Sequence, residues 1–176
     1  GQPDVFLIKD YWGNQAGMFN LITLHKEMVI ESNLILRTVG SSTLQLNQDA
    51  SLGLLKNVTA TNLLLQELSI INETGLKQSI SELLNEFYKS DMTVAAIIEK
   101  CGDFIFNNFQ YIKGITNIET TVAEILEHRS GVCQDFAHVM LEMLRSLGIP
   151  SRYVSGYICP NKNGMRGEGA THAWIE

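Results

Sequence analysis

The sequence predicts an α+β protein in which short strands come first, helices follow, and a helix–strand–loop–strand unit comes last. Three observations support this fold class. Short apolar runs broken by turn residues fill the first part of the chain. From about residue 76, apolar residues recur at every third or fourth position, which is helical spacing. Near the end, strand-forming residues flank a glycine-rich loop. We therefore expect a β-rich domain over residues 1–75 and a second domain over residues 76–176.

Strand signals dominate the N-terminal region. Val5–Ile8 is a short apolar run, and Asp10–Asn14 is a cluster of turn residues that predicts a hairpin around Trp12-Gly13-Asn14. The same kind of pattern indicates further strands at Met18–Leu24, Glu27–Ser32, Asn33–Val39 and Thr43–Asn47. The segment Leu52–Ile71 is ambiguous, because its apolar runs suit a helix or a strand equally well.

Helical periodicity begins near Lys77. One apolar face is formed by Ile80, Leu83, Leu84 and Phe87. A second and longer stripe covers Val94–Ile105, with Asp91 or Thr93 as the expected N-cap. Cys101 falls on that stripe, so its spacing predicts a side chain packed in the core.

Two more helices are predicted before the final strands. Asn107–Tyr111 is expected to be the frayed end of the preceding helix, and Thr121 with Glu124 fits a capping box that starts a short helix. A further helix is predicted between Ser130-Gly131 and the stop signal Gly148-Ile149-Pro150. Its buried stripe consists of Cys133, Phe136, Ala137, Met140, Leu141, Leu144 and Leu147.

Cys133 falls in the first turn of this helix. Free backbone N–H groups and the helix dipole favour an anion there, so a thiol ionises more easily, and the thiolate is the nucleophile. Strand-forming residues follow at Ser151–Ile158, and after the glycine-rich loop Asn161–Gly169 a second strand carries His172. One thiol and one imidazole in a compact unit are the components of a Cys–His nucleophile. On spacing alone, a buried structural thiol and a structural histidine remain alternatives.

These residues resemble a known family. Gly-Val-Cys133-Gln-Asp-Phe-Ala-His, then Leu-Gly-Ile-Pro-Ser-Arg-Tyr-Val-Ser-Gly-Tyr, then Gly-Ala-Thr-His172-Ala-Trp-Ile-Glu are similar to the bacterial transglutaminase-like cysteine proteases. The resemblance implies a papain-like core in which the cysteine helix packs on an antiparallel sheet. It also implies Cys133 as nucleophile, His172 as its base, and an orienting Asp on the next strand, beyond Glu176.

The N-terminal hairpin resembles the β-rich domain that precedes the core in the same family, so the chain is expected to lack sequence at both ends. The reaction that the resemblance implies is hydrolysis of an amide or peptide bond through an acyl-enzyme. The same residues would serve a transglutaminase-type acyltransferase, and a non-catalytic peptide-binding module on this fold is a third possibility. Hydrolysis is favoured because Gly-Val-Cys-Gln-Asp departs from the Gly-Gln-Cys-Trp pattern of animal crosslinking enzymes.

The amino-acid composition restricts the classes of molecule that the protein is expected to bind. The net charge is −6 and no basic block is present, which argues against nucleic acid or an anionic membrane and leaves a peptide or protein substrate. Three cysteines without a CxxC pair favour a reduced, cytoplasmic setting. No cofactor is expected, and the sequence does not predict the oligomeric state.

Other titratable residues offer alternatives to the Cys–His pair. A zinc site made of Cys133, His138, Cys159 and His172 is disfavoured, because Cys-x4-His is an unusual ligand spacing, so no metal is expected. His138 lies about 500° around the helix from Cys133 and is expected to make a structural hydrogen bond. Asp135 is expected to stabilise the helix dipole rather than to orient the imidazole.

Overall fold

A computed structural model describes residues 3–31, 47–71, 74–117, 119–157 and 171–176. The predicted strand Asn33–Val39, the loop Asn161–Gly169, Cys159, and all of Thr43–Asn47 except its last residue lie outside the described residues. The chain divides into two compact units, Gly1–Thr43 and Leu44–Glu176. The predicted domain division at residue 75 stays a prediction, because contacts alone do not establish which segments fold independently.

The first unit contains a single described hairpin. Strand β1 (Phe6–Lys9) pairs antiparallel with β2 (Gln15–Met18). The predicted turn is confirmed: the backbone N–H of Asn14 donates to the Asp10 carboxylate at 2.7 Å, and Gly13 has a positive φ of 84°. The strands predicted between Met18 and Ser32 are wrong for residues 19–31, which form no strand. The alternation of apolar and polar residues favours a strand, but a strand also needs a neighbouring strand to pair with its backbone N–H and C=O groups.

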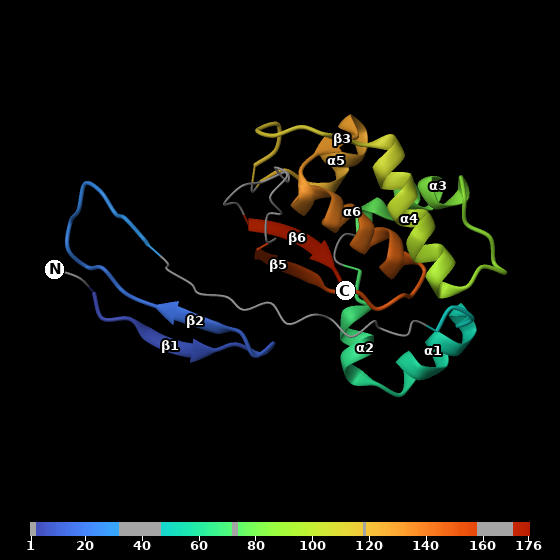
Figure 1. Cartoon of the computed structure of the whole chain (residues 1–176), viewed down its shortest axis with the longest axis horizontal. Coiled ribbons are helices and arrows are strands. Elements are labelled where there is room, and N and C mark those ends of the chain that lie inside the picture. The colour runs from blue at the N-terminus through green and yellow to red at the C-terminus, as the bar shows by residue number, and fades with distance from the viewer. Residues whose placement is uncertain (1–2, 32–46, 72–73, 118, 158–170) are drawn as a thin grey trace, which may run out of the picture. The chain divides into compact units, whose positions relative to one another are not determined.

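The second unit is mainly helical (Figure 1). Its elements in order are α1 (Leu52–Ala60), α2 (Leu63–Leu68), η1 (Thr74–Leu76), α3 (Lys77–Asn85), α4 (Val94–Asn108), β3 (Gln110–Tyr111), α5 (Val122–His128), β4 (Ser130–Gly131), α6 (Cys133–Ser146), β5 (Tyr153–Tyr157) and β6 (Thr171–Ile175). The ambiguous segment Leu52–Ile71 is therefore helical. Its two helices begin at the N-caps Ser51 and Asn62, whose side chains accept backbone N–H groups.

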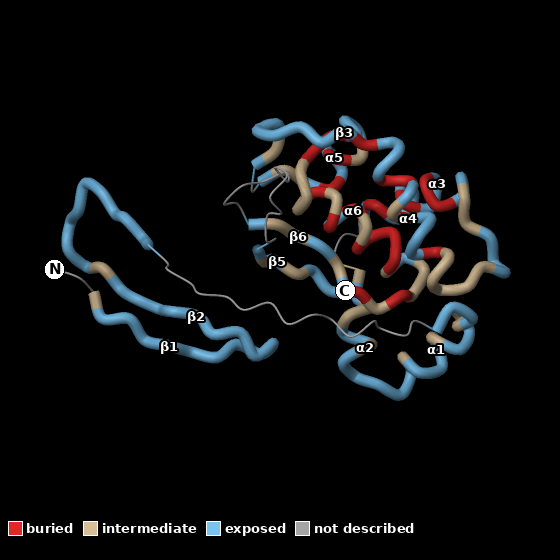
Figure 2. The backbone as a smooth tube through the Cα atoms, in the orientation of Figure 1, coloured by how far each residue is buried: buried red, intermediate tan, exposed pale blue. Residues whose placement is uncertain are grey.

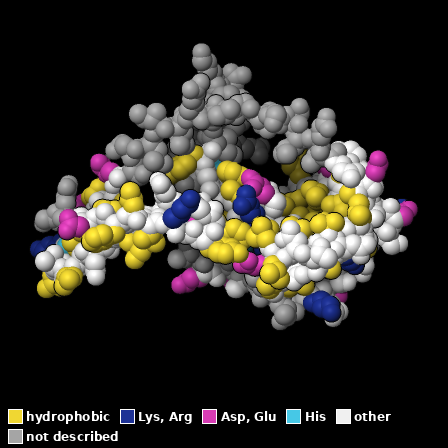
Figure 3. All heavy atoms as spheres, turned by 90° about the horizontal axis from the view of Figure 1, so that it is seen from below, with side chains coloured by type: hydrophobic (Ala, Val, Ile, Leu, Met, Phe, Trp, Pro, Cys, Tyr) yellow, Lys and Arg dark blue, Asp and Glu magenta, His cyan; other side chains and the backbone are white. Residues whose placement is uncertain are grey.

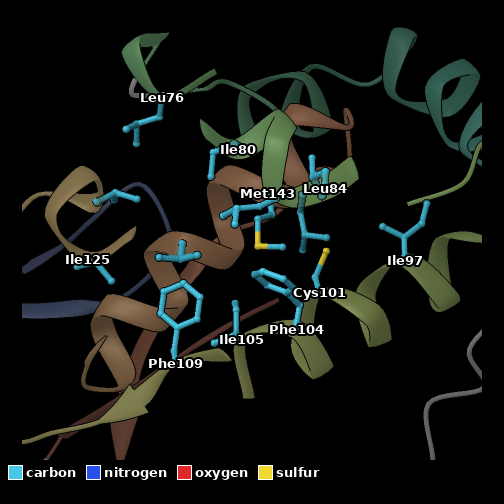
Figure 4. Packing of buried hydrophobic residues seen from close by; sticks show 14 of the residues in the cluster. Leu76, Ile80, Leu84, Ile97, Cys101, Phe104, Ile105, Phe109, Ile125 and Met143 are labelled. Carbon is cyan, nitrogen blue, oxygen red and sulfur yellow. The ribbon is translucent and has the colours of Figure 1, made fainter. Parts of the chain in front are cut away.

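Helix α6 is the centre of the second unit. It packs against α3, α4, α5 and β6, and Figure 1 shows it running between α4 and the β5–β6 pair. Figure 2 shows that the buried residues are concentrated in these helices. The core side chains converge in Figure 4 and include Ile80, Leu84, Ile97, Cys101, Phe104, Ile105, Phe109, Ile125 and Met143. The predicted burial of Cys101 is confirmed, since its side chain is 0% exposed.

The predicted caps are also confirmed. Thr93 is the N-cap of α4, and its hydroxyl accepts the backbone N–H of Ala96 at 3.3 Å. At the start of α5, Thr121 and Glu124 form the capping box, with the carboxylate of Glu124 accepting the backbone N–H of Thr121 at 2.8 Å.

Two short sheets complete the unit. Strand β3 pairs parallel with β4, because the backbone N–H of Gln110 donates to the carbonyl of Arg129 at 2.8 Å. The predicted frayed helix end is therefore wrong at Gln110 and Tyr111, which are recruited into this ladder. Strands β5 and β6 pair antiparallel, as their predicted strand character requires, and Gly156 lies opposite His172.

Two arginines hold the connections around α6. Arg129 ends α5 in the left-handed conformation, with φ at 47°, and its guanidinium lies 5.9 Å from the ring centre of Phe104. Arg145, in the last turn of α6, donates to the carbonyl of Ser151 at 3.2 and 2.7 Å and to that of Ile70 at 3.1 Å. It therefore joins three segments of the chain.

Among the described residues, no helix combines the length and the apolar character that a membrane span requires.

Candidate active site

Cys133 is the first residue of α6, as the sequence predicted. Val132 precedes it as the N-cap with an extended backbone, and the Cys133 side chain is half-buried. The unpaired N–H groups of a first helical turn and the dipole both favour negative charge at this position. The free thiol of Cys133 therefore lies at the N-terminal end of α6.

The turn before Cys133 is fixed by Asp135, which is only 3% exposed. Its Oδ2 accepts the backbone N–H of Val132 at 2.7 Å and the hydroxyl of Thr116 at 2.6 Å. Valine has no side-chain acceptor, so this is one half of a capping box. A Cβ at Gly131 would lie 2.6 Å from the same oxygen, which means that only glycine fits beside the carboxylate.

His172 lies on β6 and is half-buried. Its Nε2 is buried and has no hydrogen-bond partner among the described residues. No described group therefore fixes the orientation of the imidazole through Nε2. The neighbouring Trp174 lies against Gly156, where an added Cβ would come within 2.6 Å of the indole.

Cys133 lines a groove of about 1090 Å³ between α4, β3, α6 and β6. Its lining is mostly apolar and aromatic and includes Phe106, Phe109, Phe136, Met140, Trp174 and Ile175. A smaller pocket of about 270 Å³ lies next to α6 and is more polar, with Asn117, Thr120, Gln134, Asp135, His138 and Tyr153 in its wall. The first helical turn of α6 therefore contributes to both cavities.

Tyr153, which the sequence pattern indicates only as a strand former, adds a phenol beside the first turn of α6. Burial raises the pKa of Tyr153, and electrostatic interactions with Cys133 and Asp135 raise it further. Its hydroxyl therefore stays protonated and able to donate at neutral pH. His138 stacks on its ring at 4.9 Å between centroids. The structure thus shows a ring contact for His138, while the hydrogen bond expected from the sequence stays a prediction.

Within the described ranges, no group of three histidine, cysteine or acidic side chains could hold a metal ion. Cys159, one of the four ligands considered for zinc, is not among the described residues.

Comparison with known proteins gives a consistent result. Residues 81–176 match the family model described as the transglutaminase-like superfamily. An uncharacterized protein of Mycobacterium leprae is 30% identical over 95% of this chain, and one of Mycobacterium tuberculosis is 31% identical over 94%. The chain spans 60% and 55% of the length of these two relatives.

A solved structure shows the same fold. It comes from Cytophaga hutchinsonii and bears the name of a proposed cysteine protease. The TM-score is 0.57 at 24% identity, and the match covers 73% of this chain and 41% of the other.

Proposed function

Because this chain belongs to the transglutaminase-like superfamily, we propose that it is a thiol-dependent hydrolase of amide or peptide bonds. The observation that carries the proposal is the position of Cys133, in the first turn of α6 and in the wall of a large apolar groove. A thiol at a helix start is activated, and an adjacent groove is where a substrate chain can bind. The name of the Cytophaga protein supports the same reaction class.

In the proposed reaction, the Cys133 sulfur attacks the amide carbonyl carbon while its proton passes to His172. The carbonyl oxygen becomes an oxyanion, which the backbone N–H of Cys133 stabilises. The tetrahedral intermediate then collapses: the C–N bond breaks, His172 protonates the leaving amine, and a thioester remains. Water next attacks the thioester and gives its proton to His172. The second tetrahedral intermediate then collapses: the C–S bond breaks, the carboxylic acid leaves, and His172 returns the proton to the Cys133 sulfur.

Part of the proposal comes from the family resemblance. It supports a papain-like arrangement of helix and sheet, and an Asp on a strand after β6 that would orient the imidazole. Asp135 is a poor substitute for that group, because its Oδ2 already accepts two hydrogen bonds. The experiments should therefore also use a version extended through the additional sequence that the longer mycobacterial relatives carry. We expect the extension to raise turnover more than it raises alkylation of Cys133.

The test is hydrolysis of a quenched peptide library by the native chain and by three variants. Cys133→Ala and His172→Ala should each lower kcat/KM by about a thousandfold or more. Cys101→Ala serves as the cysteine control, because Cys101 is buried on α4, and it should retain activity. Full hydrolysis by Cys133→Ala would overturn the proposal.

Product analysis distinguishes the related functions. Mass spectrometry of the reaction with added primary amine should find the free acid as the main product. An amine-linked product would indicate a transglutaminase-type acyltransferase. Peptide binding without any product, by the native chain and the extended chain alike, would indicate a binding module.

A further inference from the structure

We propose that Asp135 is a positioning residue that ties the Cys133 turn to the loop between β3 and α5. One carboxylate would then hold the nucleophile and the loop that lines both cavities in a single geometry. This inference rests on the proposed function, because it assigns a catalytic purpose to the fixed geometry.

The nucleophile side of the link is the turn from Gly131 to Cys133. Asp135 reaches back along the first turn of α6 and accepts the backbone N–H of Val132, the residue immediately before the thiol. The carboxylate also lies close to Gly131, where an added Cβ would come within 2.6 Å of Oδ2, so a larger residue there would displace it. In this proposal, Asp135 therefore fixes the backbone conformation from which the Cys133 side chain projects.

The loop side of the link is Thr116, whose hydroxyl donates to the same oxygen of Asp135 at 2.6 Å. This hydrogen bond joins residues 19 positions apart in the sequence. Lys113, three residues earlier, lines the large apolar groove, whereas Asn117, the next residue, lines the smaller polar pocket. Thr116 therefore anchors the loop at the point where it passes from one cavity to the other.

Burial makes the arrangement rigid. An almost fully buried carboxylate is stable only while donors satisfy it, so releasing either Val132 or Thr116 leaves it with an uncompensated desolvation cost. The two donors are thus coupled through one acceptor. Catalysis is sensitive to such coupling, because a displacement of about 1 Å at the reacting atoms can cost about a hundredfold in rate.

Thr116→Val separates the two halves of the link, because it removes the loop donor and keeps the shape and the Val132 bond. We expect KM for peptide substrates to rise about fivefold, and kcat and the iodoacetamide rate at Cys133 to fall by much less than in Asp135→Ala, because the Val132 bond remains. Thr116→Ser, which restores the hydroxyl, should return KM to the native value. Thr61→Val is the matched control, since it removes an exposed threonine hydroxyl bonded to the Val58 carbonyl on α1. It should leave KM unchanged.

Asp135→Ala removes both halves and should lower kcat and the alkylation rate of Cys133 together, by about a hundredfold. Asp135→Asn keeps an acceptor oxygen and should recover most of that loss. The control is Asp103→Ala, which removes an exposed acid from α4. Hydrogen exchange at the Val132 amide, which needs no catalytic activity, should speed up in Asp135→Ala and less so in Asp135→Asn.

An unchanged KM in Thr116→Val, or no recovery in Thr116→Ser, would overturn the inference even if Asp135→Ala failed to fold. Native alkylation and exchange in Asp135→Ala would also overturn it. Failure of the proposed function would appear elsewhere, as hydrolysis that persists in Cys133→Ala. In that case the exchange measurement would still report whether Asp135 fixes the turn.

Discussion

The two units differ in how they use apolar side chains. In the described part of the first unit no residue is buried, and Phe6 and Leu7 on β1 are 68% and 75% exposed. Figure 3 shows hydrophobic side chains exposed on the surface. In the second unit, Ile97 and Met143 are 0% exposed and belong to one continuous core. An isolated two-stranded hairpin is marginal at best, whereas a packed core stabilises its elements cooperatively.

This difference indicates that the second unit supplies most of the stability of the described chain. Helix α6 carries Cys133 at its start and packs against α3, α4, α5 and β6. The proposed nucleophile, Cys133, is therefore attached to a helix that packs on the core of the second unit.

The core substitution Ile97→Ala should lower the free energy of unfolding by about 3 kcal/mol, because it leaves a cavity in packed surroundings. Phe6→Ala, on the exposed hairpin, should change it by less than about 0.5 kcal/mol. Urea unfolding followed by far-ultraviolet circular dichroism measures both. Equal losses would mean that the hairpin is part of the cooperative unit.

Removing the Arg145 guanidinium should have the next largest effect. Arg145→Met should cost about 2 kcal/mol, because the carbonyls of Ser151 and Ile70 lose charge-assisted hydrogen bonds. Arg152→Met is the control, since its ion pair with Glu176 is exposed and should contribute at most about 1 kcal/mol. A smaller loss for Arg145 than for Arg152 in the same urea titration would contradict this assignment.

Alkaline pH should destabilise the core through Cys101. Burial raises the pKa of Cys101 to about 12, so the folded protein keeps this proton after the unfolded chain has lost it. The unfolded state then binds fewer protons, and this thiol lowers the free energy of unfolding above about pH 8.5, by about 1.4 kcal/mol per pH unit. Comparison with Cys101→Ser between pH 8 and 10 isolates the contribution. Parallel pH profiles would show that Cys101 ionises equally in both states.

The raised pKa and the burial of Cys101 also predict which of the two described thiols reacts first. Iodoacetamide at neutral pH should modify Cys133 well before Cys101, and peptide mapping by mass spectrometry gives the two rates. Similar rates at both thiols in folded protein would mean that the first turn of α6 does not activate Cys133.

The smallest effect concerns local capping. Thr121→Ala should cost about 1 kcal/mol, because α5 loses its N-cap and packs directly against α6. Asp10→Ala, which removes the side-chain acceptor from the hairpin turn, should leave the melting temperature of the second unit unchanged. Calorimetry of the two variants checks this, and a lower melting temperature for Asp10→Ala would show that the turn supports the core.

Local signals explain why much of the second unit could be predicted. Thr93, Thr121 and the glycine before Ile149 each act on their own helix, and Gly148 has the positive φ of 77° that a helix end favours. The position of Cys133 followed from the same kind of signal. The strand character of β5 and β6 was likewise evident from their β-branched and aromatic residues.

Contacts between distant residues explain the rest. The β3–β4 pairing depends on Gln110 meeting Arg129, and nothing in the short β3 segment indicates that partner. The link from Thr116 to Asp135 is equally invisible in sequence, because neither residue type is unusual in its place. Tyr153 could have been noticed as an aromatic residue on the strand that follows the cysteine helix. The strands predicted at residues 19–31 failed because alternation describes a face and does not supply a partner strand.

Arg129 shows how tolerance to mutation can depend on the backbone rather than on the side chain. Its left-handed conformation costs on the order of 1 kcal/mol in a non-glycine residue, and its contact with Phe104 returns a similar amount. Glycine at this position would lose both the backbone cost and the contact with Phe104. Arginine and glycine should therefore give similar free energies of unfolding. Valine or isoleucine would keep the cost and lose the contact. A library randomised at this position should therefore recover arginine, glycine and asparagine together while excluding β-branched residues, although the side chain lies on the surface.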